Sequence, residues 1–378
     1  MTSRTRRAWS AAGISGTAAL LAAAGGATWY YANRLTEPPA LTWPPAPKAD
    51  DRVEVVALRD GEVTLTGRGA ARPGVWGLVW VGGYGRVGEV STSGEDGSVR
   101  PFALLAGEPP EVATSGTLDA YAYPADPSVL GVPWEDVTFD SPVGACPAWW
   151  FPGERDTCVV LVHGRSARRH EAFRMLPTIL AAGLPALVIS YRNDPDAPRS
   201  DDGRSHLGAT EWEDVEAAVR WALEHGASDV ILVGFSMGGA CVVNFAALSS
   251  LADRVRAMIL EAPVLDWGPV IRAAAIDRGL PPQVLSLLLP ATMRLASVRV
   301  GIDWAEMRHD PATFRHPKLL IHGTADVTVP VELADAVAEA RPDIVTYLRV
   351  EGAGHVRSWN ADPDRYAATV ADFLDVVL

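Results

Sequence analysis

From about residue 130 to the C-terminus, short apolar runs alternate with longer amphipathic stretches. The amphipathic stretches at residues 171–183 and 210–226 have the spacing of helices with one buried face. The apolar runs are nearly continuous, as in strands that are buried on both faces of a sheet. These runs cover residues 158–162, 186–191, 229–235, 257–263 and 318–323, and two further β-like runs precede them at residues 134–141 and 147–152. This order predicts an α/β fold in which helices flank a mostly parallel sheet.

The alternation is interrupted between Asp266 and Asp310 by two helix-like stretches, GPVIRAAAIDRG and PPQVLSLLLPATMRLASV. An insertion between two strands of a parallel sheet lies at one edge of that sheet. We therefore expect residues 266–310 to form a helical cap within a catalytic domain that extends over residues 129–378.

The preceding part of the chain has a different pattern. Residues 50–128 contain four short β-like runs, VEVVAL, EVTLTG, GVWGLVWVGG and GEVSTSG, which are broken by Gly and Asp. This pattern predicts a small β-rich N-terminal domain, whose expected role is to pack against the catalytic domain or to set its distance from a membrane. Residues 36–49 are rich in proline and predict a stiff linker.

The first 35 residues have the pattern of a membrane anchor. Arg4, Arg6 and Arg7 precede an uncharged run from Ala8 to Tyr31, which is long enough to span a bilayer. The leading arginines predict that the N-terminus stays inside. We therefore expect a single-pass protein of the cell membrane whose catalytic domain is extracytoplasmic. The alternative is a cleaved signal peptide and a secreted protein.

Charge and cysteine content exclude several classes of function. The net charge of −13 would repel a phosphate backbone, so nucleic acid is not expected as a partner. The three cysteines lack metal-ligand spacing, and neither a metal nor another cofactor is expected. A disulfide between Cys146 and Cys158 is disfavoured because each falls on a separate predicted strand.

The strongest motif is Gly234-Phe235-Ser236-Met237-Gly238-Gly239. It follows a predicted strand and precedes a helix-compatible run of small residues, ACVVNFAALSS. Gly234 and Gly238 allow a tight strand-to-helix turn, a nucleophile elbow that holds Ser236 in a strained conformation and exposes its hydroxyl. Ser236 is therefore the predicted nucleophile.

A serine hydroxyl needs a general base, and the base needs an acid to orient it. Asp326 follows the predicted strand at residues 318–322, and His355 lies in a Gly-rich loop before the last helix. Asp326 and His355 are the expected acid and base, with Asp266 as the alternative acid. His163 and His322 each stand in a His-Gly step and are expected to be structural. The remaining histidines are expected to face solvent: His170, His206, His225, His309 and His316.

The segment Leu161-Val162-His163-Gly164-Arg165 follows the third predicted strand of the sheet. In a fold with a nucleophile elbow, this loop supplies one backbone N–H of the oxyanion hole, and the residue after the nucleophile supplies the other. The expected donors are the backbone N–H groups of Arg165 and Met237.

Residues 131–378 resemble the α/β-hydrolase superfamily, because LVHGR, GFSMGG, HGTADVTVP and GAGH stand in the order of the superfamily's motifs. The chain is similar to bacterial serine hydrolases of the serine aminopeptidase-like and prolyl-oligopeptidase-like groups. Tyr191-Arg192-Asn193-Asp194, with Glu211-Trp212, is similar to actinobacterial members. The resemblance implies the triad and the oxyanion positions named above. GFSMGG and HGR depart from the GDSAGG and HGGG of hormone-sensitive-lipase-like esterases, so an oxyanion hole of that type is not implied.

The resemblance leaves the substrate open, since its groups include esterases, lipases, thioesterases and peptidases. An apolar cap and a nearby membrane suit an acyl group, and the prediction is a carboxylesterase that acts on a small-molecule ester through an acyl-enzyme. The alternative is a serine peptidase for short peptides, which usually needs carboxylates to hold the free amine. The candidates for that role are Glu261, Asp266, Asp303 and Glu306. A binding protein without catalysis would be indicated by a lost triad residue, and none is lost.

Overall fold

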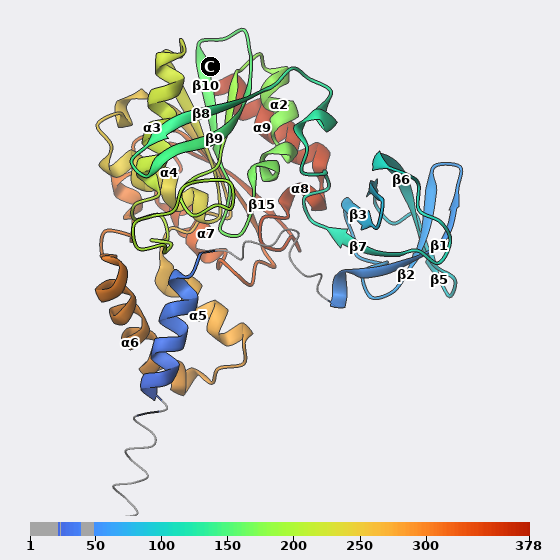
Figure 1. The fold of residues 1–378 in the computed structure, drawn as a ribbon, viewed down its shortest axis with the longest axis horizontal. Coiled ribbons are helices and arrows are strands. Elements are labelled where there is room, and N and C mark those ends of the chain that lie inside the picture. The colour runs from blue at the N-terminus through green and yellow to red at the C-terminus, as the bar shows by residue number, and fades with distance from the viewer. Residues whose placement is uncertain (1–21, 23, 39–48) are drawn as a thin grey trace, which may run out of the picture.

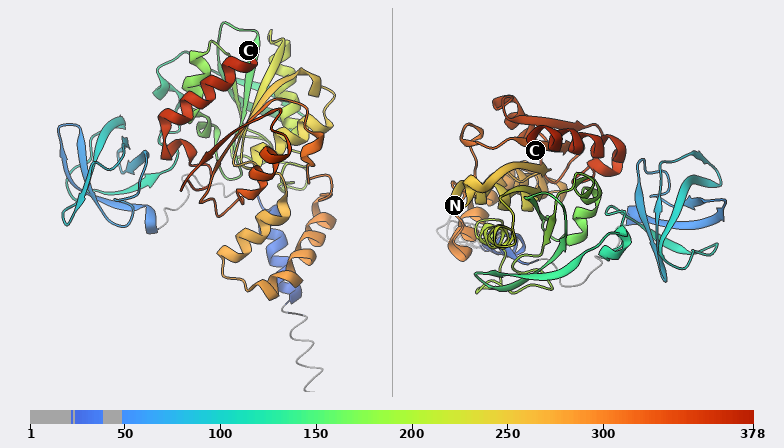
Figure 2. Two further views of the ribbon diagram at one scale, coloured as in Figure 1. Left: turned by 180° about the vertical axis from the view of Figure 1, so that it is seen from behind. Right: turned by 90° about the horizontal axis from the view of Figure 1, so that it is seen from above.

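The strands of the chain form two separate sheets, which the computed structural model describes over residues 22, 24–38 and 49–378 (Figures 1 and 2). The first sheet holds β1–β7 and the second holds β8–β15. The second sheet lies within residues that match the predicted α/β pattern. The first lies within the predicted β-rich N-terminal region and protrudes to one side of the larger body (Figure 1).

The N-terminal sheet closes into a six-stranded β-barrel because β2 pairs with β6 as well as with β1. Its strands are β1 (Arg52–Arg59), β2 (Glu62–Thr66), β3 (Trp76–Trp80), β4 (Gly83–Val87), β6 (Gly97–Gly107) and β7 (Ser115–Asp119), and β5 (Thr92–Gly94) is added outside β6. Alternate side chains such as Val53, Val55, Val63 and Leu65 fill the interior. The sequence pattern identified β1, β2, β3 and β5 but not β4, β6 and β7.

The larger sheet has the strand order β15-β14-β13-β12-β10-β11-β9-β8, in which only β9 runs against its neighbours. Its strands are β8 (Glu135–Ser141), β9 (Gly144–Phe151), β10 (Thr157–Val162), β11 (Ala186–Ile189), β12 (Asp229–Phe235), β13 (Val255–Glu261), β14 (Lys318–Gly323) and β15 (Val345–Val350). The mostly parallel sheet predicted from the apolar runs is confirmed. The edge strand β15 has no such run, because its side chains are alternately exposed and buried.

Helices cover both faces of this sheet, and alternate residues of each strand belong to different cores. Cys158, Val160 and Val162 of β10 pack in the core that includes helices α3 (Trp212–Glu224), α4 (Met237–Leu248) and α7 (Glu332–Ala340). Val159 and Leu161 pack in the opposite core, with α2 (Leu176–Ala181) and α9 (Pro363–Val377). This two-sided burial explains why the central strands are apolar throughout.

The other helical elements are short or lie outside these two layers. They are η1 (Ala49–Asp51), η2 (Pro127–Leu130), η3 (Arg169–Arg174), η4 (Ala252–Arg254), α5 (Trp267–Asp277), α6 (Pro282–Val300), η5 (Pro311–Thr313) and α8 (Ser358–Ala361). The expected helical insertion is present as α5 and α6, which project from the end of the sheet where β13 leads out (Figure 2). A further helix over residues 24–36 lies beside them in two opposite views. We call α5, α6 and this helix the three-helix cap.

The predicted membrane anchor falls mostly outside the described residues, as does most of the proline-rich linker, because the structure describes neither residues 1–21 and 23 nor residues 39–48. In the part of the chain that the structure does describe, no helix is long and apolar enough to cross a membrane. The anchor over residues 1–35 therefore stays a prediction.

The barrel contacts the catalytic part of the chain through α8. The Asn360 side chain donates to the backbone oxygens of Val75 (2.7 Å) and Ala120 (2.9 Å), and the Val75 N–H donates to Asn360 O (2.7 Å). The guanidinium of Arg357 stacks on the Trp76 ring at 5.1 Å. The barrel thus holds the segment that directly follows His355.

The three cysteines are free and buried. Cys146 in β9 and Cys158 in β10 are kept apart by β11, which lies between those strands. Burial raises the pKa of both thiols to about 12, so the reactive thiolate is absent at neutral pH. We expect a disulfide-exchange reagent to label no thiol in the native chain and all three in guanidinium chloride. Rapid labelling of the native chain would contradict this burial.

Candidate active site

Ser236 lies in the turn between β12 and α4, with φ of 52° and ψ of −114°. This backbone conformation is rare for a residue with a side chain, and turns of this kind occur at nucleophile elbows. The turn requires glycine on both sides of Ser236. A Cβ on Gly238 would lie 2.2 Å from Val162 O, and one on Gly234 would lie 2.6 Å from Gly239 Cα. The glycines therefore let α4 begin directly against β10.

Three side chains that are distant in sequence form one hydrogen-bonded chain beside this turn. His355 Nε2 lies 2.8 Å from Ser236 Oγ, and His355 Nδ1 lies 2.7 Å from Asp326 Oδ2. An ionised carboxylate only accepts, so the proton of a neutral His355 resides on Nδ1. Nε2 is then the acceptor for the Ser236 hydroxyl, as a general base must be.

The Asp326 carboxylate has four polar partners. Oδ1 accepts from the backbone N–H groups of Thr328 and Val329, both at 2.8 Å, and Oδ2 lies 3.2 Å from His322 Nε2 as well as near His355. Burial alone would raise the pKa of this carboxyl. The hydrogen bonds from His322, His355 and Val329 outweigh burial and hold its pKa well below its usual range. His322, which the sequence suggested only as a turn residue, therefore also contacts the acid.

Two backbone N–H groups are available beside Ser236. Among the residues that the structure describes, no oxygen accepts a hydrogen bond from the N–H of Arg165 or Met237. Met237 is the first residue of α4, where an N–H has no partner within the helix. The loop that carries Arg165 passes directly beside the serine, since a Cβ on Gly164 would lie 3.1 Å from Ser236 Cβ.

The Gly164–Arg165 loop is held by a hydrogen bond to the buried carboxylate of Glu171, which was not predicted from the sequence. Glu171 Oε2 accepts from the Gly164 N–H at 2.7 Å. The Glu171 side chain is buried. It comes from η3, seven residues further along the chain. The only sequence feature that could have indicated this contact is a glutamate seven residues after the glycine of the His-Gly step.

His163, which precedes this loop, has an acceptor at each ring nitrogen. Nδ1 lies 2.9 Å from Gly164 O, and Nε2 lies 2.8 Å from Asp194 Oδ2. Burial would lower the pKa of His163, but the contacts with Asp194 outweigh burial and raise the pKa. His163 thus fixes the turn by hydrogen bonds, as its position in a His-Gly step suggested.

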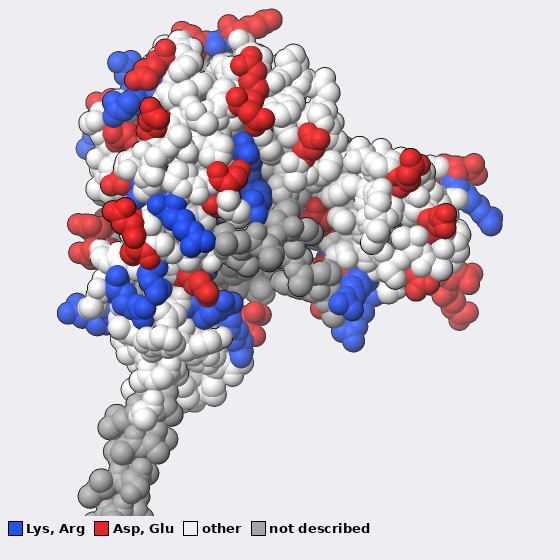
Figure 3. Space-filling view, viewed as in Figure 1, with Lys and Arg blue, Asp and Glu red and all other residues white. Residues whose placement is uncertain are grey.

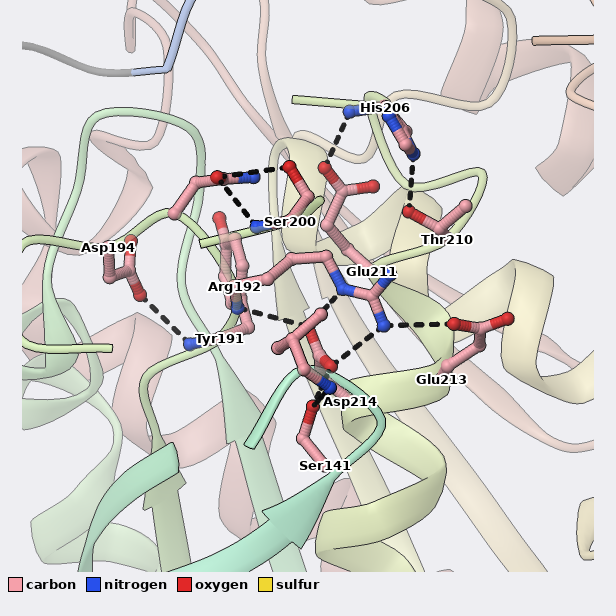
Figure 4. Close-up of polar contacts among 12 residues, drawn as sticks. Ser141, Tyr191, Arg192, Asp194, Ser200, His206, Thr210, Glu211, Glu213 and Asp214 are labelled. Carbon is pink, nitrogen blue, oxygen red and sulfur yellow. Dashed lines mark hydrogen bonds and ion pairs between the residues drawn. The ribbon is translucent and has the colours of Figure 1, made fainter. Parts of the chain in front are cut away.

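The segment after β11 is tied to the start of α3 by a buried ion pair (Figure 4). Arg192 Nε and a terminal nitrogen reach both oxygens of Asp214, at 2.8 and 2.9 Å, in a bidentate pair. Glu213 accepts from the same guanidinium at 2.9 Å. Glu211 accepts from the His206 N–H at 2.8 Å and shapes the next turn. Through Asp194 and His163, this segment supports the loop beside Ser236.

A second buried network, which no local pattern in the sequence predicts, lies behind His355. The Arg174 guanidinium donates to Val356 O and to Glu171 O. Burial lowers the pKa of Arg174, but the nearby carboxylates of Glu261 and Glu171 outweigh burial and raise it. Val356 has φ of 50°, a strained value for a β-branched residue. Arg174 therefore holds the strained residue next to His355.

The structure gives Asp266 and His170 structural contacts away from the Ser236–His355 pair. Asp266, the alternative acid, caps α5 by accepting from the Gly268 N–H at 2.8 Å, and it is Asp326 that lies beside His355. His170 does not face solvent. It is buried, its ring lies tilted against the Tyr121 ring with the centroids 4.1 Å apart, and burial lowers its pKa to about 3. Tyr121 comes from the region between the barrel and β8, whose packing on η3 the local sequence could not reveal.

The end of the N-terminal helix reaches the loop beside Ser236. A terminal nitrogen of Arg165 donates to Arg34 O at 3.1 Å and to Glu37 O at 2.8 Å. The Ser205 N–H donates to Thr36 O at 2.9 Å, and Thr36 is fully buried. Residues assigned to an anchor and a linker thus contact the catalytic part of the chain.

Within residues 22, 24–38 and 49–378, no cluster of three or more His, Cys, Asp or Glu side chains is arranged to hold a metal ion. What the described residues offer is a serine hydroxyl, an imidazole, a carboxylate and two backbone N–H groups. Such a set is suited to acyl transfer.

The chain belongs to the alpha/beta hydrolase family, whose profile matches residues 159–369, more than half of the chain. No curated protein matches it. The esterase Pf2001 of Pyrococcus furiosus covers 67% of this chain and 95% of its own, with a TM-score of 0.54 and 19% identity. Another crystal form of that esterase covers 67% of this chain and 94% of its own, with a TM-score of 0.53 and 18% identity. A thermophilic esterase from Thermogutta terrifontis covers 64% of this chain and 99% of its own, with a TM-score of 0.46 and 18% identity. The likeness to the Pyrococcus esterase shows the fold.

Proposed function

We propose that this protein is a serine hydrolase that cleaves carboxylic esters, with Ser236 as nucleophile, His355 as general base and Asp326 as the acid that orients it. The observation that carries the proposal is the continuous hydrogen-bonded chain from Ser236 Oγ to Asp326, at 2.8 and 2.7 Å. The strained serine and the two available N–H groups support the same chemistry.

In the proposed reaction, Ser236 Oγ bonds to the ester carbonyl carbon while its proton moves to His355 Nε2. The carbonyl oxygen becomes an oxyanion, and the N–H groups of Arg165 and Met237 donate to it. The C–O bond to the leaving group then breaks, and His355 returns the proton to the departing alcohol. A water molecule, deprotonated by His355, cleaves the acyl-enzyme and releases the carboxylic acid.

Three of the four candidate amine-binding carboxylates, all except the exposed Glu306, are engaged in local structure, which favours an ester over a peptide. Glu261 is fully buried, and its Oε2 accepts from the Tyr366 hydroxyl at 2.8 Å. Asp266 and Asp303 each accept from a backbone N–H two residues ahead, at 2.8 Å. These carboxylates are thus used in local structure, whereas a peptidase that binds a free N-terminus needs one directed at the substrate.

The test uses the full chain, because residues 34–37 contact the loop beside Ser236. We expect hydrolysis of p-nitrophenyl esters, measured from acetate to palmitate, and loss of that activity after treatment with a fluorophosphonate. Short peptide p-nitroanilides should be cleaved far more slowly. Cleavage of the anilides without cleavage of any ester would overturn the ester assignment in favour of a peptidase, and absence of fluorophosphonate labelling would overturn both.

Replacement of Asp326 by asparagine tests the role of the acid. An amide would favour the wrong tautomer of His355, with the proton on Nε2, and we expect kcat to fall by about four orders of magnitude. Asp266→Asn, the same change at the alternative acid, should leave kcat within about threefold, a difference below about 1 kcal/mol. If Asp266→Asn had the larger effect, the assignment of the acid would be wrong.

We also propose that the N-terminal segment attaches the chain to the cell membrane, with the catalytic part outside the cytoplasm. This proposal rests on the sequence alone, namely on Arg4, Arg6, Arg7 and the uncharged run to Tyr31. The mass of the protein extracted from cells distinguishes a retained anchor from a cleaved signal peptide.

A further inference from the structure

The three-helix cap differs in charge from the rest of the molecule. Residues 267–300 contain four arginines and one aspartate, a net charge of +3 in a chain whose net charge is −13. The arginines are Arg272, Arg278, Arg294 and Arg299. Among the residues that the structure describes, none of the four forms an ion pair with a carboxylate, although Arg299 stacks on the Trp29 ring at 5.9 Å. Their guanidinium groups remain available to an anionic partner.

Helix α6 is apolar on two sides, and the described residues cover only one of them. Its covered side carries Leu285, Leu289, Thr292, Ala296 and Val300. Its other side exposes Val284, Leu287, Ala291 and Val298, with Arg294 among them. Leu287 and Val298 are 77% and 71% exposed. A helix that only closed a cap would present polar side chains to water on this side.

The exposed apolar side chains gather on the cap. Among the described residues, 13 large apolar side chains are exposed, and six of them lie on the three cap helices. The six are Trp29, Tyr30, Ile276, Val284, Leu287 and Val298. Figure 3 shows Lys and Arg gathered where the cap meets the larger body, while the far end of the cap is mostly uncharged on this face. Trp, Tyr and Arg at the border of an apolar patch are typical of membrane interfaces.

The sequence before the cap helix continues this apolar character. Residues 8–21 contain no Asp, Glu, Lys or Arg, and they directly precede the helix over residues 24–36 that packs in the cap. The end of that helix contacts Arg165 and Ser205. The exposed patch and the loop beside Ser236 are thus connected through the helix over residues 24–36.

We infer that the outer side of the three-helix cap is a docking surface for an anionic lipid bilayer. Val284, Leu287 and Val298 enter the interface, and the cap arginines bind lipid phosphates. If the proposed esterase function holds, the consequence is that lipophilic esters reach Ser236 from the lipid phase.

The test places a probe on the cap of the full chain, reconstituted into phosphatidylcholine vesicles with and without phosphatidylglycerol. Leu287→Cys and Val298→Cys are labelled with an environment-sensitive fluorophore, since the native cysteines are buried. The matched control is Val81→Cys on the barrel, where Val81 is 99% exposed. We expect a blue shift and quenching by spin-labelled lipid at positions 287 and 298, stronger with phosphatidylglycerol, and neither effect at position 81.

Arginine variants test separately how much the positive charge of the cap contributes to binding of anionic vesicles. Arg278→Gln and Arg294→Gln should each shift the balance from quenched to unquenched probe at position 287 by about fivefold in anionic vesicles. Arg59→Gln, an exposed arginine on the barrel, should not. Equal effects of all three variants would overturn the role of the cap arginines.

The outcomes separate this inference from the proposed function. No response at positions 287 and 298, with fluorophosphonate labelling of Ser236 intact, overturns the docking surface and leaves the hydrolase. A lipid response without such labelling overturns the hydrolase and leaves the docking surface. A concentration-dependent blue shift in detergent without vesicles would show that a second copy covers the patch, and it would overturn the bilayer as its partner.

Discussion

Ser236→Ala is expected to lower kcat for ester hydrolysis by about six orders of magnitude, to the level that the remaining oxyanion donors and substrate binding provide. The effect is large because His355 has no other acyl acceptor to deprotonate except water. KM should change little, because the hydroxyl forms its bond only in the transition state. The measurement is the initial rate on the best p-nitrophenyl ester, after circular dichroism shows that the variant is folded.

The matched control is Ser249→Ala, which makes the same change in a buried serine at the other end of α4. This variant should retain wild-type kcat. A Ser236→Ala variant that keeps activity within about tenfold of the wild type, a difference of only about 1.4 kcal/mol in the barrier, would refute Ser236 as the nucleophile.

Arg174→Met is expected to destabilise the fold by about 3–5 kcal/mol. Methionine fills much of the volume but removes the buried cation whose charge Glu171 and Glu261 stabilise. It also leaves Val356 O without its donor, next to His355. Urea unfolding, followed by circular dichroism, measures the free energy of unfolding, and ester hydrolysis should fall as well because the strained loop at Val356 is no longer fixed.

Arg220→Met controls for the loss of an arginine as such. Arg220 pairs with Glu216 on the surface of α3, and the pair is worth about 0.3–0.5 kcal/mol. If both variants lost the same small amount of stability, the buried network behind His355 would have no special role.

The parts of the fold that the sequence predicted are those in which local pattern and tertiary burial agree. The central strands are apolar throughout because both faces are covered, so β10, β12 and β14 could be recognised. The edge strand β15 and the barrel strands β4, β6 and β7 could not, because their side chains are partly exposed. Internal glycines also interrupt the pattern of β4 and β7. Their pairing depends on partners that are distant in sequence.

The same distinction applies to the candidate site. The Ser236 turn was recognisable because the glycines that it requires lie within two residues of Ser236. The structure places Asp326 and His355 beside this turn. Arg174 was missed because its acceptor, Val356, is 182 residues away. The contact of Arg165 with Glu37, 128 residues apart, was missed for the same reason. Local patterns specify reactive groups, whereas the groups that hold them come from anywhere in the chain.

The contact between the barrel and α8 has a consequence for the order of synthesis. The barrel strands end at Asp119, whereas His355 and Asn360 lie far behind them in the chain and leave the ribosome later. Because N-terminal domains generally fold first during synthesis, the barrel is formed before the segment that docks on it exists. A nascent chain that lacks residues 355–360 therefore carries Ser236 without its proposed base. If the proposed function holds, activity begins only after these residues are made and Asn360 closes onto Val75 and Ala120.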